Sequence, residues 1–213
     1  MKFAAAITLF AASASAFGPF SGGAKKAAAV ATPAFTVETI PGALEPMGIW
    51  DPLGFAAKAD EKTLKRYREA ELTHGRVAML ATIGFLAGEA VEGSSFLWDA
   101  SVTGPAITHL TQVPPLFWAL LATGIGAAEQ KRAEIGWVEP SNVPVDQPGL
   151  LRAEYTPGDI GFDPLGLKPE DPEELMVLQN KELQNGRLAM LAAAGFMAQE
   201  LADGKGIMEH LMN

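Results

Sequence analysis

A glutamate, a neutral electron-pair donor and an arginine recur at one spacing in two distant segments. They are Glu71, His74 and Arg76 in the first segment, and Glu182, Asn185 and Arg187 in the second. Residues three apart lie on one face of a helix, so each glutamate and its neutral neighbour face the same way. A carboxylate, an imidazole and an amide oxygen can each give one axial ligand to a magnesium ion whose other four ligands come from a tetrapyrrole ring.

The two segments belong to an internal repeat. Residues 71–89 and 182–200 are identical at 12 of 19 positions, with a constant offset of 111. Related loops precede them at residues 49–55 and 161–167, and both loops contain Asp-Pro-Leu-Gly. The repeat unit is therefore a loop followed by a helix.

The charges of the repeat are unexpected because the stretches around them are apolar. A lone charge inside a bilayer costs roughly 2.5–3.5 kcal/mol on insertion scales, so such charges are expected to be paired and functional. Two equivalent helices crossed about a pseudo-two-fold axis would pair Glu71 with Arg187 and Glu182 with Arg76. Small residues would let the helices approach closely. These are Ala78, Ala81, Gly84, Ala189, Ala192, Ala193 and Gly195.

Three long helices must carry these residues. The repeats predict helices over about residues 60–91 and 171–203, and an uncharged run after Pro114-Pro115 predicts a third over 114–131. Each is a marginal membrane span by hydropathy, because the middle run is short and the repeats carry charges. We expect an all-α membrane protein with three transmembrane helices, the first and third homologous and crossed, and a short amphipathic helix at the C-terminus.

Composition excludes several classes of function. The chain has no cysteine, which rules out disulfides, thiolate zinc sites, iron–sulfur clusters and a cysteine nucleophile. A net charge of -9 argues against a nucleic-acid partner, because phosphate binding needs clustered Lys and Arg. No nucleophile constellation, phosphate loop or catalytic dyad is evident, so we expect no enzyme.

The amino-terminal residues have the composition of a leader. Residues 1–16 read as a signal peptide, with Lys2, an apolar run and Ala14-Ser15-Ala16. Residues 17–37 contain Lys25 and Lys26 but no acid, which is typical of a transit peptide. This order resembles the two-part leader of proteins entering the secondary plastids of diatoms, although a secreted protein with a disordered start would look similar. Residues 38–213 would form the mature domain.

The pattern E-x-x-[HN]-x-R on two homologous helices, with a third helix between them, resembles the chlorophyll a/b- and a/c-binding light-harvesting family. The resemblance covers residues 42–210. The stretches RYREAELTHGR, GEAVEGSSF, Thr103–Leu110 and GDIGFDPLGL are most similar to the stress-related LHCX branch of diatoms, akin to the LHCSR proteins of green algae.

The resemblance implies a set of chlorophyll ligands, with Arg76 and Arg187 as ion-pair partners. The ligands would be Glu71, His74, Glu182, Asn185, Gln199, Glu129 and His210. The chain departs from the family at Leu121, where relatives carry a further ligand on the middle helix. A plain helix-end carboxylate is the alternative for Glu129, and the spacing to His210 differs from that of the plant proteins.

The resemblance also assigns the loops and the acidic ends. The loop residues Trp50, Asp51, Phe162 and Asp163 would hold the polar ends of two carotenoids, although Asp-Pro-Leu-Gly also forms turns. Six acids would face the lumen and could sense its pH, or could simply be solvated. They are Glu89, Glu92, Asp99, Glu200, Asp203 and Glu209.

We therefore expect a plastid thylakoid protein, multi-pass, that dissipates excess light energy. Its cofactors would be chlorophyll a, chlorophyll c, fucoxanthin and diadinoxanthin or diatoxanthin. Thylakoid lipids, other light-harvesting proteins and photosystem I or II would be its partners. An antenna subunit that passes excitation to a photosystem shares every ligand and is the first alternative. An inverted-repeat transporter also pairs charges in mid-membrane, but needs broken helices and more spans.

Overall fold

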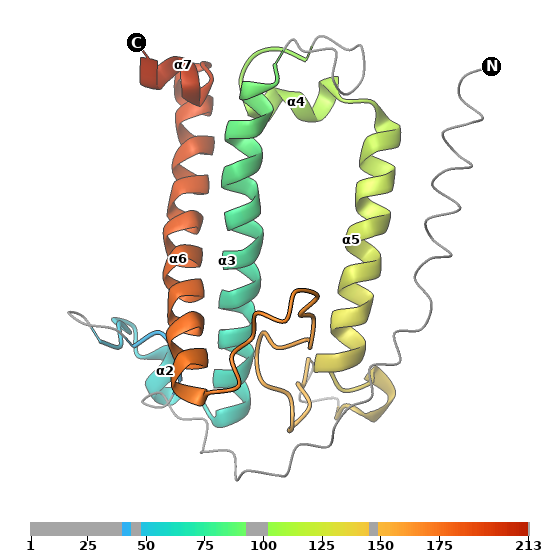
Figure 1. The fold of residues 1–213 in the computed structure, drawn as a ribbon, viewed down its shortest axis with the longest axis vertical. Coiled ribbons are helices and arrows are strands. Elements are labelled where there is room, and N and C mark those ends of the chain that lie inside the picture. The colour runs from blue at the N-terminus through green and yellow to red at the C-terminus, as the bar shows by residue number, and fades with distance from the viewer. Residues whose placement is uncertain (1–39, 44–47, 93–101, 145–148, 213) are drawn as a thin grey trace. The chain divides into compact units, whose positions relative to one another are not determined.

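Two long parallel helices and a third, antiparallel one dominate the computed structural model of the chain (Figure 1). The structure describes residues 40–43, 48–92, 102–144 and 149–212. Helix α3 spans Glu61–Ala90, α5 spans Pro115–Gly136 and α6 spans Pro172–Asp203. Three short helices accompany them: α2 over Phe55–Lys58, α4 over Ala106–Gln112 and α7 over Ile207–Met212. The all-α class is confirmed, since the only β pairing among the described residues is an isolated bridge between Trp137 and Leu151.

The helix ends follow local chemistry. The Asp60 side chain accepts a hydrogen bond from the backbone N–H of Thr63, which caps α3. Prolines occupy the first turn of α5 and of α6, where a missing N–H costs nothing. Gly204, at a φ of 65°, ends α6 in the left-handed conformation.

The observed helices differ little from the expected ranges, except in the middle. Helix α3 is one residue shorter than 60–91 at each end, and α6 begins one residue later than 171–203. Helix α5 continues to Gly136, five residues beyond the expected end at residue 131. The expectation stopped where the apolar run stops, but Ala, Glu and Arg in the extension are good helix formers. Helices α2 and α4 were not predicted, and the expected leader, residues 1–37, lies outside the described residues.

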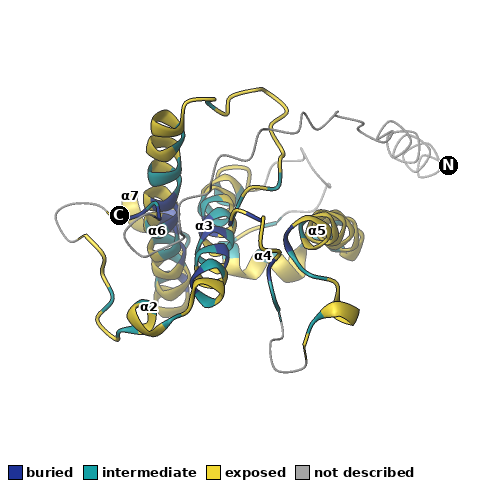
Figure 2. Ribbon diagram, turned by 90° about the horizontal axis from the view of Figure 1, so that it is seen from below, coloured by how far each residue is buried: buried dark blue, intermediate teal, exposed yellow. Residues whose placement is uncertain are grey.

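Helices α3 and α6 share the apolar core, and their backbones meet at two glycines. A Cβ atom added to Gly75 would lie 3.0 Å from the Cα of Gly186, and the reverse distance is the same. The buried core residues on both helices lie along this contact, among them Leu72, Leu183 and Ala189 (Figure 2). In contrast, Gly136 is the one buried residue of α5. Within the described part of the chain, α5 therefore contributes little to the buried core.

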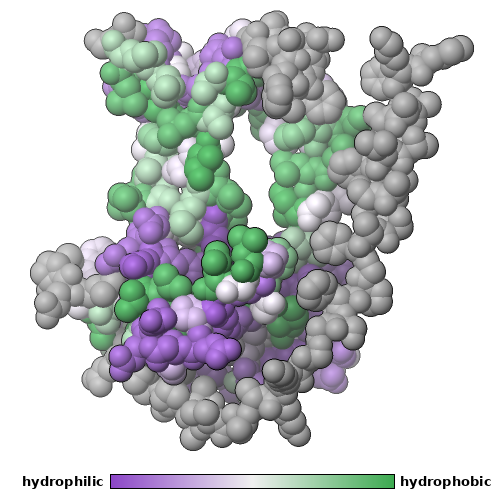
Figure 3. Space-filling view, viewed as in Figure 1, coloured by the Kyte–Doolittle hydropathy of each residue, from purple (hydrophilic) through white to green (hydrophobic). Residues whose placement is uncertain are grey.

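Large apolar side chains are exposed along all three long helices. Apolar surface covers the carboxyl-terminal parts of α3 and α6, whereas polar residues gather around their amino-terminal ends (Figure 3). The exposed positions repeat with the sequence, since Leu80 and Leu191 are 73% and 74% exposed at equivalent positions. By length and hydropathy, no single helix in the described part of the chain qualifies as a membrane span, whereas α4 and α5 would qualify together but are bent by 105°.

Candidate pigment-ligand sites on the paired helices

The structure brings each repeat glutamate to the arginine of the opposite helix. Arg187 Nε donates to Glu71 Oε1 at 2.8 Å, and Arg76 Nε donates to Glu182 Oε1 at 2.7 Å. On each helix the glutamate precedes the contact glycine, Gly75 or Gly186, and the arginine follows it. Because the two backbones approach closely at these glycines, each arginine reaches the glutamate of the other helix. Each carboxylate is therefore paired with an arginine across the interface.

His74 and Asn185 are held in the same posture. His74 Nδ1 lies 2.7 Å from the carbonyl oxygen of Ala70, and Asn185 Nδ2 donates to the carbonyl of Lys181 at 2.9 Å. A carbonyl can only accept, so Nδ1 of His74 carries a proton, and the neutral form of the ring has its lone pair on Nε2. The Asn185 amide likewise keeps its oxygen free. Both side chains are exposed, with one lone-pair atom apiece available to a ligand.

The two repeat sites differ in one contact that the sequence did not predict. Arg68 Nη1 donates to Glu71 Oε2 at 2.5 Å, so both oxygens of Glu71 accept from arginines. The position equivalent to Arg68 in the second repeat is Gln179. Glu182 Oε2 accepts no hydrogen bond within the described part of the chain, and an oxygen with two open lone pairs is the better ligand atom.

A cavity of about 800 Å³ opens beside the Glu71–Arg187 pair. Trp50, Phe55 and Tyr67 contribute aromatic surface to its lining. Small-molecule sites combine such apolar walls with a few polar groups. No group of three or more acidic or histidine side chains that could hold a bare metal ion occurs among the described residues. The single donors here suit a metal that brings most of its own ligands.

Gln199 has an unsatisfied amide. Its Nε2 atom is buried and has no hydrogen-bond partner in the described structure, which is costly for a polar group. Its counterpart in the first repeat is Gly88, where an added Cβ would lie 3.4 Å from Nδ1 of His109 on α4, an ordinary contact distance. This site therefore occurs in one repeat alone, and α4 lies against the equivalent position in the other.

Glu129 and His210 have weaker surroundings. Glu129 is exposed and lies 3.4 Å from Arg132 Nη1, one turn further along α5. His210 Nδ1 lies 3.1 Å from Asp203 Oδ2, which leaves Nε2 for another partner. Both positions keep a donor atom, but neither is supported by a second copy in the repeat.

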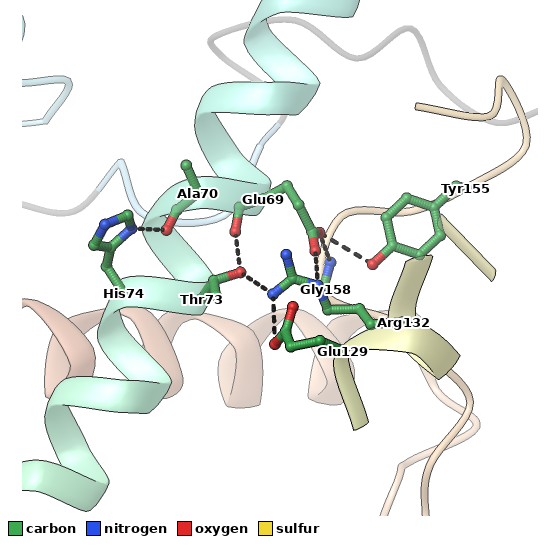
Figure 4. A network of polar contacts seen from close by, with 8 residues as sticks. All are labelled: Glu69, Ala70, Thr73, His74, Glu129, Arg132, Tyr155 and Gly158. Carbon is green, nitrogen blue, oxygen red and sulfur yellow. Dashed lines mark hydrogen bonds and ion pairs between the residues drawn. The ribbon is translucent and has the colours of Figure 1, made fainter. Parts of the chain in front are cut away.

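Arg132 also joins a buried network that sequence reasoning missed (Figure 4). Glu69 on α3 is 3% exposed, lies 3.6 Å from Arg132 Nε, and accepts hydrogen bonds from Tyr155 Oη at 3.0 Å and from the backbone N–H of Gly158 at 2.7 Å. Burial raises the pKa of Tyr155, and the charge of Glu69 raises it further, to about 12. The network ties α5 and the loop before α6 to α3.

The two Asp-Pro-Leu-Gly loops adopt the same turn. Asp51 accepts hydrogen bonds from three backbone N–H groups that begin α2, and Asp163 accepts them from Leu167 and Lys168. The N–H groups of Lys168 and Leu167 hold the pKa of Asp163 below its usual range. Trp50 and Phe162, which precede the aspartates, are 73% and 77% exposed. The aspartates thus make turns, and the aromatic rings remain available to a ligand.

The acids at the carboxyl-terminal ends of α3 and α6 also follow the repeat. Glu89 accepts hydrogen bonds from the N–H groups of Ile207 and Met208, which begin α7. Glu200 is 2% exposed and accepts from those of Ala106 and Ile107, which begin α4. Each carboxylate caps a short helix, as the positive end of a helix dipole favours.

The remaining acids of this group are exposed. Glu92 accepts from the N–H of Gly104 at 2.7 Å, and Asp203 lies beside His210. Glu209 lies in the first turn of α7 and is exposed. Asp99 lies outside the described residues. Glu89 and Glu200 are thus engaged in contacts between helices of the two repeats.

The sequence is similar to known proteins over most of its length. Residues 36–201 match the sequence model of the family described as Chlorophyll A-B binding protein. The chain is 51% identical over 177 residues to light-harvesting complex stress-related protein 3.2, chloroplastic, of Chlamydomonas reinhardtii, which is 82% of this chain and 67% of that protein.

Two fucoxanthin proteins are also similar. Identity is 47% over 165 residues to the fucoxanthin-chlorophyll a-c binding protein, chloroplastic, of Isochrysis galbana, covering 78% of this chain and 77% of that one. It is 34% over 200 residues to the fucoxanthin-chlorophyll a-c binding protein B, chloroplastic, of Phaeodactylum tricornutum, covering 94% and 95%.

Proposed function

The chain belongs to the chlorophyll a/b-binding protein family, and on that premise we propose that it binds chlorophylls a and c and xanthophylls in the thylakoid membrane and takes part in photoprotective dissipation of excess light energy. The matching posture of His74 and Asn185 carries this proposal. Metal-bound histidines usually donate their other ring N–H to a carbonyl or carboxylate, as His74 does. Two different residue types with the same free lone pair, at one repeat position, fit ligation better than a surface role.

The chain's own residues would hold and orient the pigments. When bound, chlorophyll supplies light absorption and energy transfer. Glu71 and Glu182 would give ligand oxygens that Arg187 and Arg76 neutralise, and His74 and Asn185 would give neutral donors. Gln199, Glu129 and His210 would complete the ligand set. Ligation through Gln199 would use its oxygen, and a neighbouring pigment would cover its buried amide nitrogen.

Carotenoids would lie against the apolar faces of α3 and α6, with their ends at the two Asp-Pro-Leu-Gly loops. Fucoxanthin and diadinoxanthin or diatoxanthin are long apolar molecules with polar ends. Trp50 and Phe162 offer exposed rings at the loops, and Asp51 and Asp163 lie beside them. The cavity of about 800 Å³ beside Glu71 gives room for a pigment next to Trp50.

We further propose that α3, α5 and α6 cross the thylakoid membrane and that α3 and α6 are related by a pseudo-two-fold axis. The reciprocal ion pairs and the Gly75–Gly186 contact support this arrangement. The exposed apolar side chains of α5 would face lipid and pigment. Residues 1–16 and 17–37 would be the signal and transit peptides that bring the chain to the plastid. Other light-harvesting proteins and a photosystem would be its partners.

Loss of the protein tests the photoprotective role against the role of an antenna subunit. In a strain lacking it, we expect a smaller amplitude of chlorophyll fluorescence quenching under excess light. An antenna role predicts instead a smaller absorption cross-section with the quenching amplitude unchanged, and that result would contradict the proposal.

Acidification of the lumen is the proposed signal, and Glu89 and Glu200 are its candidate sensors. Protonation of a capping carboxylate weakens the hydrogen bonds that it accepts from two backbone N–H groups. As the pH falls, α7 would therefore dock less tightly on Glu89, and α4 less tightly on Glu200. We expect Glu89→Gln with Glu200→Gln to remove the change of fluorescence lifetime between pH 7 and pH 5. Glu92→Gln is the matched control on an exposed acid. An unchanged lifetime response in the double variant would contradict the proposal.

A further inference from the structure

A Pro-Gly pair precedes both Asp-Pro-Leu-Gly loops and docks on the opposite helix. Gly42 follows Pro41 ahead of α3, and Gly158 follows Pro157 ahead of α6. The backbone N–H of Gly42 donates to Asn180 Oδ1 at 2.6 Å, and that of Gly158 donates to Glu69 Oε2 at 2.7 Å. Glu69 and Asn180 are equivalent in the repeat, being 111 residues apart. The two contacts are thus copies of one interaction.

Each glycine also lies against the arginine of the helix on which it docks. A Cβ added to Gly42 would lie 3.0 Å from Arg187 Nη2, and a Cβ added to Gly158 would lie 3.2 Å from Arg76 Nη2. Arg187 Nη1 further donates to the carbonyl of Gly42 at 2.9 Å. The backbone therefore approaches each guanidinium as closely as a residue without a side chain permits.

Two separate features favour glycine at positions 42 and 158, the backbone conformation and the space around the Cα atom. Their φ angles are +105° and +84°, which L side chains rarely adopt. Equivalent leucines close the space as well, since an added Cβ would lie 3.2 Å from Leu183 Cδ1 at Gly42 and 2.6 Å from Leu72 Cδ1 at Gly158. Turn geometry alone would not demand this, because Gly161 has a φ of +68° and nothing within 4 Å of an added Cβ.

We propose that Gly42 and Gly158 are positioning residues for the two glutamate sites, each holding the arginine that neutralises the ligand glutamate of its own repeat. Gly42 holds Arg187 toward Glu71, and Gly158 holds Arg76 toward Glu182. The inference rests on the proposed chlorophyll ligation by these glutamates. Without the turn, the guanidinium is free to swing away from the glutamate, which then loses the partner that neutralises and orients it in an apolar site.

Gly158→Ala, with Gly161→Ala as control, tests the contact separately from backbone strain. Both changes place alanine at a positive φ, but only the first meets Leu72 and Arg76. We expect about five- to tenfold weaker chlorophyll binding at Glu182 in Gly158→Ala, on the scale of one lost interaction, and wild-type binding in the control. The absorption difference spectrum of Gly158→Ala should match that of Glu182→Gln and not that of Glu71→Gln.

Substitutions of Asn180 test the turn at Gly42 without replacing a glycine. Asn180→Ala removes the acceptor of the Gly42 N–H, whereas Asn180→Asp keeps it. We expect the alanine variant to lose the band that Glu71→Gln loses, and the aspartate variant to retain it. This second pair of variants decides the matter should Gly158→Ala fail to fold.

Three results would overturn the inference. One is pigment loss in Gly158→Ala or Asn180→Ala that equals the loss in its control. Another is equal loss at both glutamate sites, which indicates general destabilisation. The third is an unchanged spectrum in Glu71→Gln and Glu182→Gln, which would overturn the ligand assignment together with this inference.

Discussion

At the scale of single residues, hydrogen bonds decide which atom faces a ligand. His74 and Asn185 each donate a side-chain hydrogen bond to the carbonyl four residues earlier, so the lone pair of the other polar atom remains on the exposed side. An amide, and an imidazole in its neutral form, carry no charge that would resist transfer into an apolar medium. This repeat position therefore requires a side chain with a hydrogen-bond donor toward the helix backbone and a lone pair toward the ligand. Histidine and asparagine both meet this requirement, which explains why two different residue types occupy it.

His74→Asn should therefore keep its chlorophyll, because the second repeat already uses asparagine there. His74→Leu removes the lone pair and should release the pigment. Chlorophyll content per chain after reconstitution distinguishes the two variants, with a small spectral shift expected for the asparagine. Full chlorophyll content in His74→Leu would show that His74 is not a ligand.

Arg76→Leu should lose both pigment and stability. Removing one member of a buried ion pair costs roughly 3–5 kcal/mol. The side chains of Arg76 and Glu182 are 40% and 33% exposed, so we expect the lower end of this range. Lys131→Leu is the control, since Lys131 is 73% exposed in its ion pair with Glu134. Thermal loss of the visible circular dichroism measures the effect. A stable, pigmented Arg76→Leu would show that pigment binding at Glu182 does not depend on the ion pair.

Tyr155 gives a pH dependence of known sign. Its pKa is raised from 10.0 to about 12, so folding favours the neutral phenol. The contribution to stability is complete below pH 10 and is lost as the pH rises toward 12. Absorbance of tyrosinate near 295 nm in Tyr67→Phe, which leaves Tyr155 as the sole tyrosine, should stay low at pH 11 while the pigment signal persists. Ionisation near pH 10 in the intact protein would contradict the network around Glu69.

At the scale of the helices, the contact between Gly75 and Gly186 sets how closely α3 and α6 approach. The ion pairs on either side depend on this distance, because each joins one helix to the other. Any side chain at this contact must push the backbones apart.

Gly75→Ala should destabilise the protein by about 1–3 kcal/mol through overpacking. Gly84→Ala is the matched control on the same helix, because nothing lies within 4 Å of its added Cβ. The control should be stabilising by roughly 0.5–1 kcal/mol, since alanine favours helix over glycine. Opposite shifts of the midpoint of thermal unfolding are expected, and shifts of the same sign would contradict the close contact.

Sequence reasoning found the helices and the reciprocal pairing because both follow from the repeat at one offset. It missed the Pro-Gly turns because four extra residues separate Gly42 from its loop, so that Gly42 and Gly158 are 116 residues apart and do not share the offset of 111. It missed Arg68, Glu69 and Arg132 because their charges do not recur in the second repeat, where Gln179 and Asn180 stand in place of Arg68 and Glu69. Contacts made once, between distant segments, leave no periodic signal.

At the scale of the whole molecule, the repeat helices form a core and the middle helix does not. Helix α5 is joined to α3 near its carboxyl end, through Arg132, Glu69 and Thr73, while its apolar residues stay exposed. Burying apolar surface is the main favourable term in folding in water, so on the proposed function lipid and pigment would cover the apolar side of this helix. Folding and pigment binding should therefore be coupled.

Pigment analysis of the purified protein tests the central claim most directly. The chain, isolated from thylakoid membranes in mild detergent, should carry chlorophyll a, chlorophyll c and fucoxanthin. Its double variant His74→Leu with Asn185→Leu should carry fewer chlorophylls per chain. A colourless, folded wild-type protein would contradict the account.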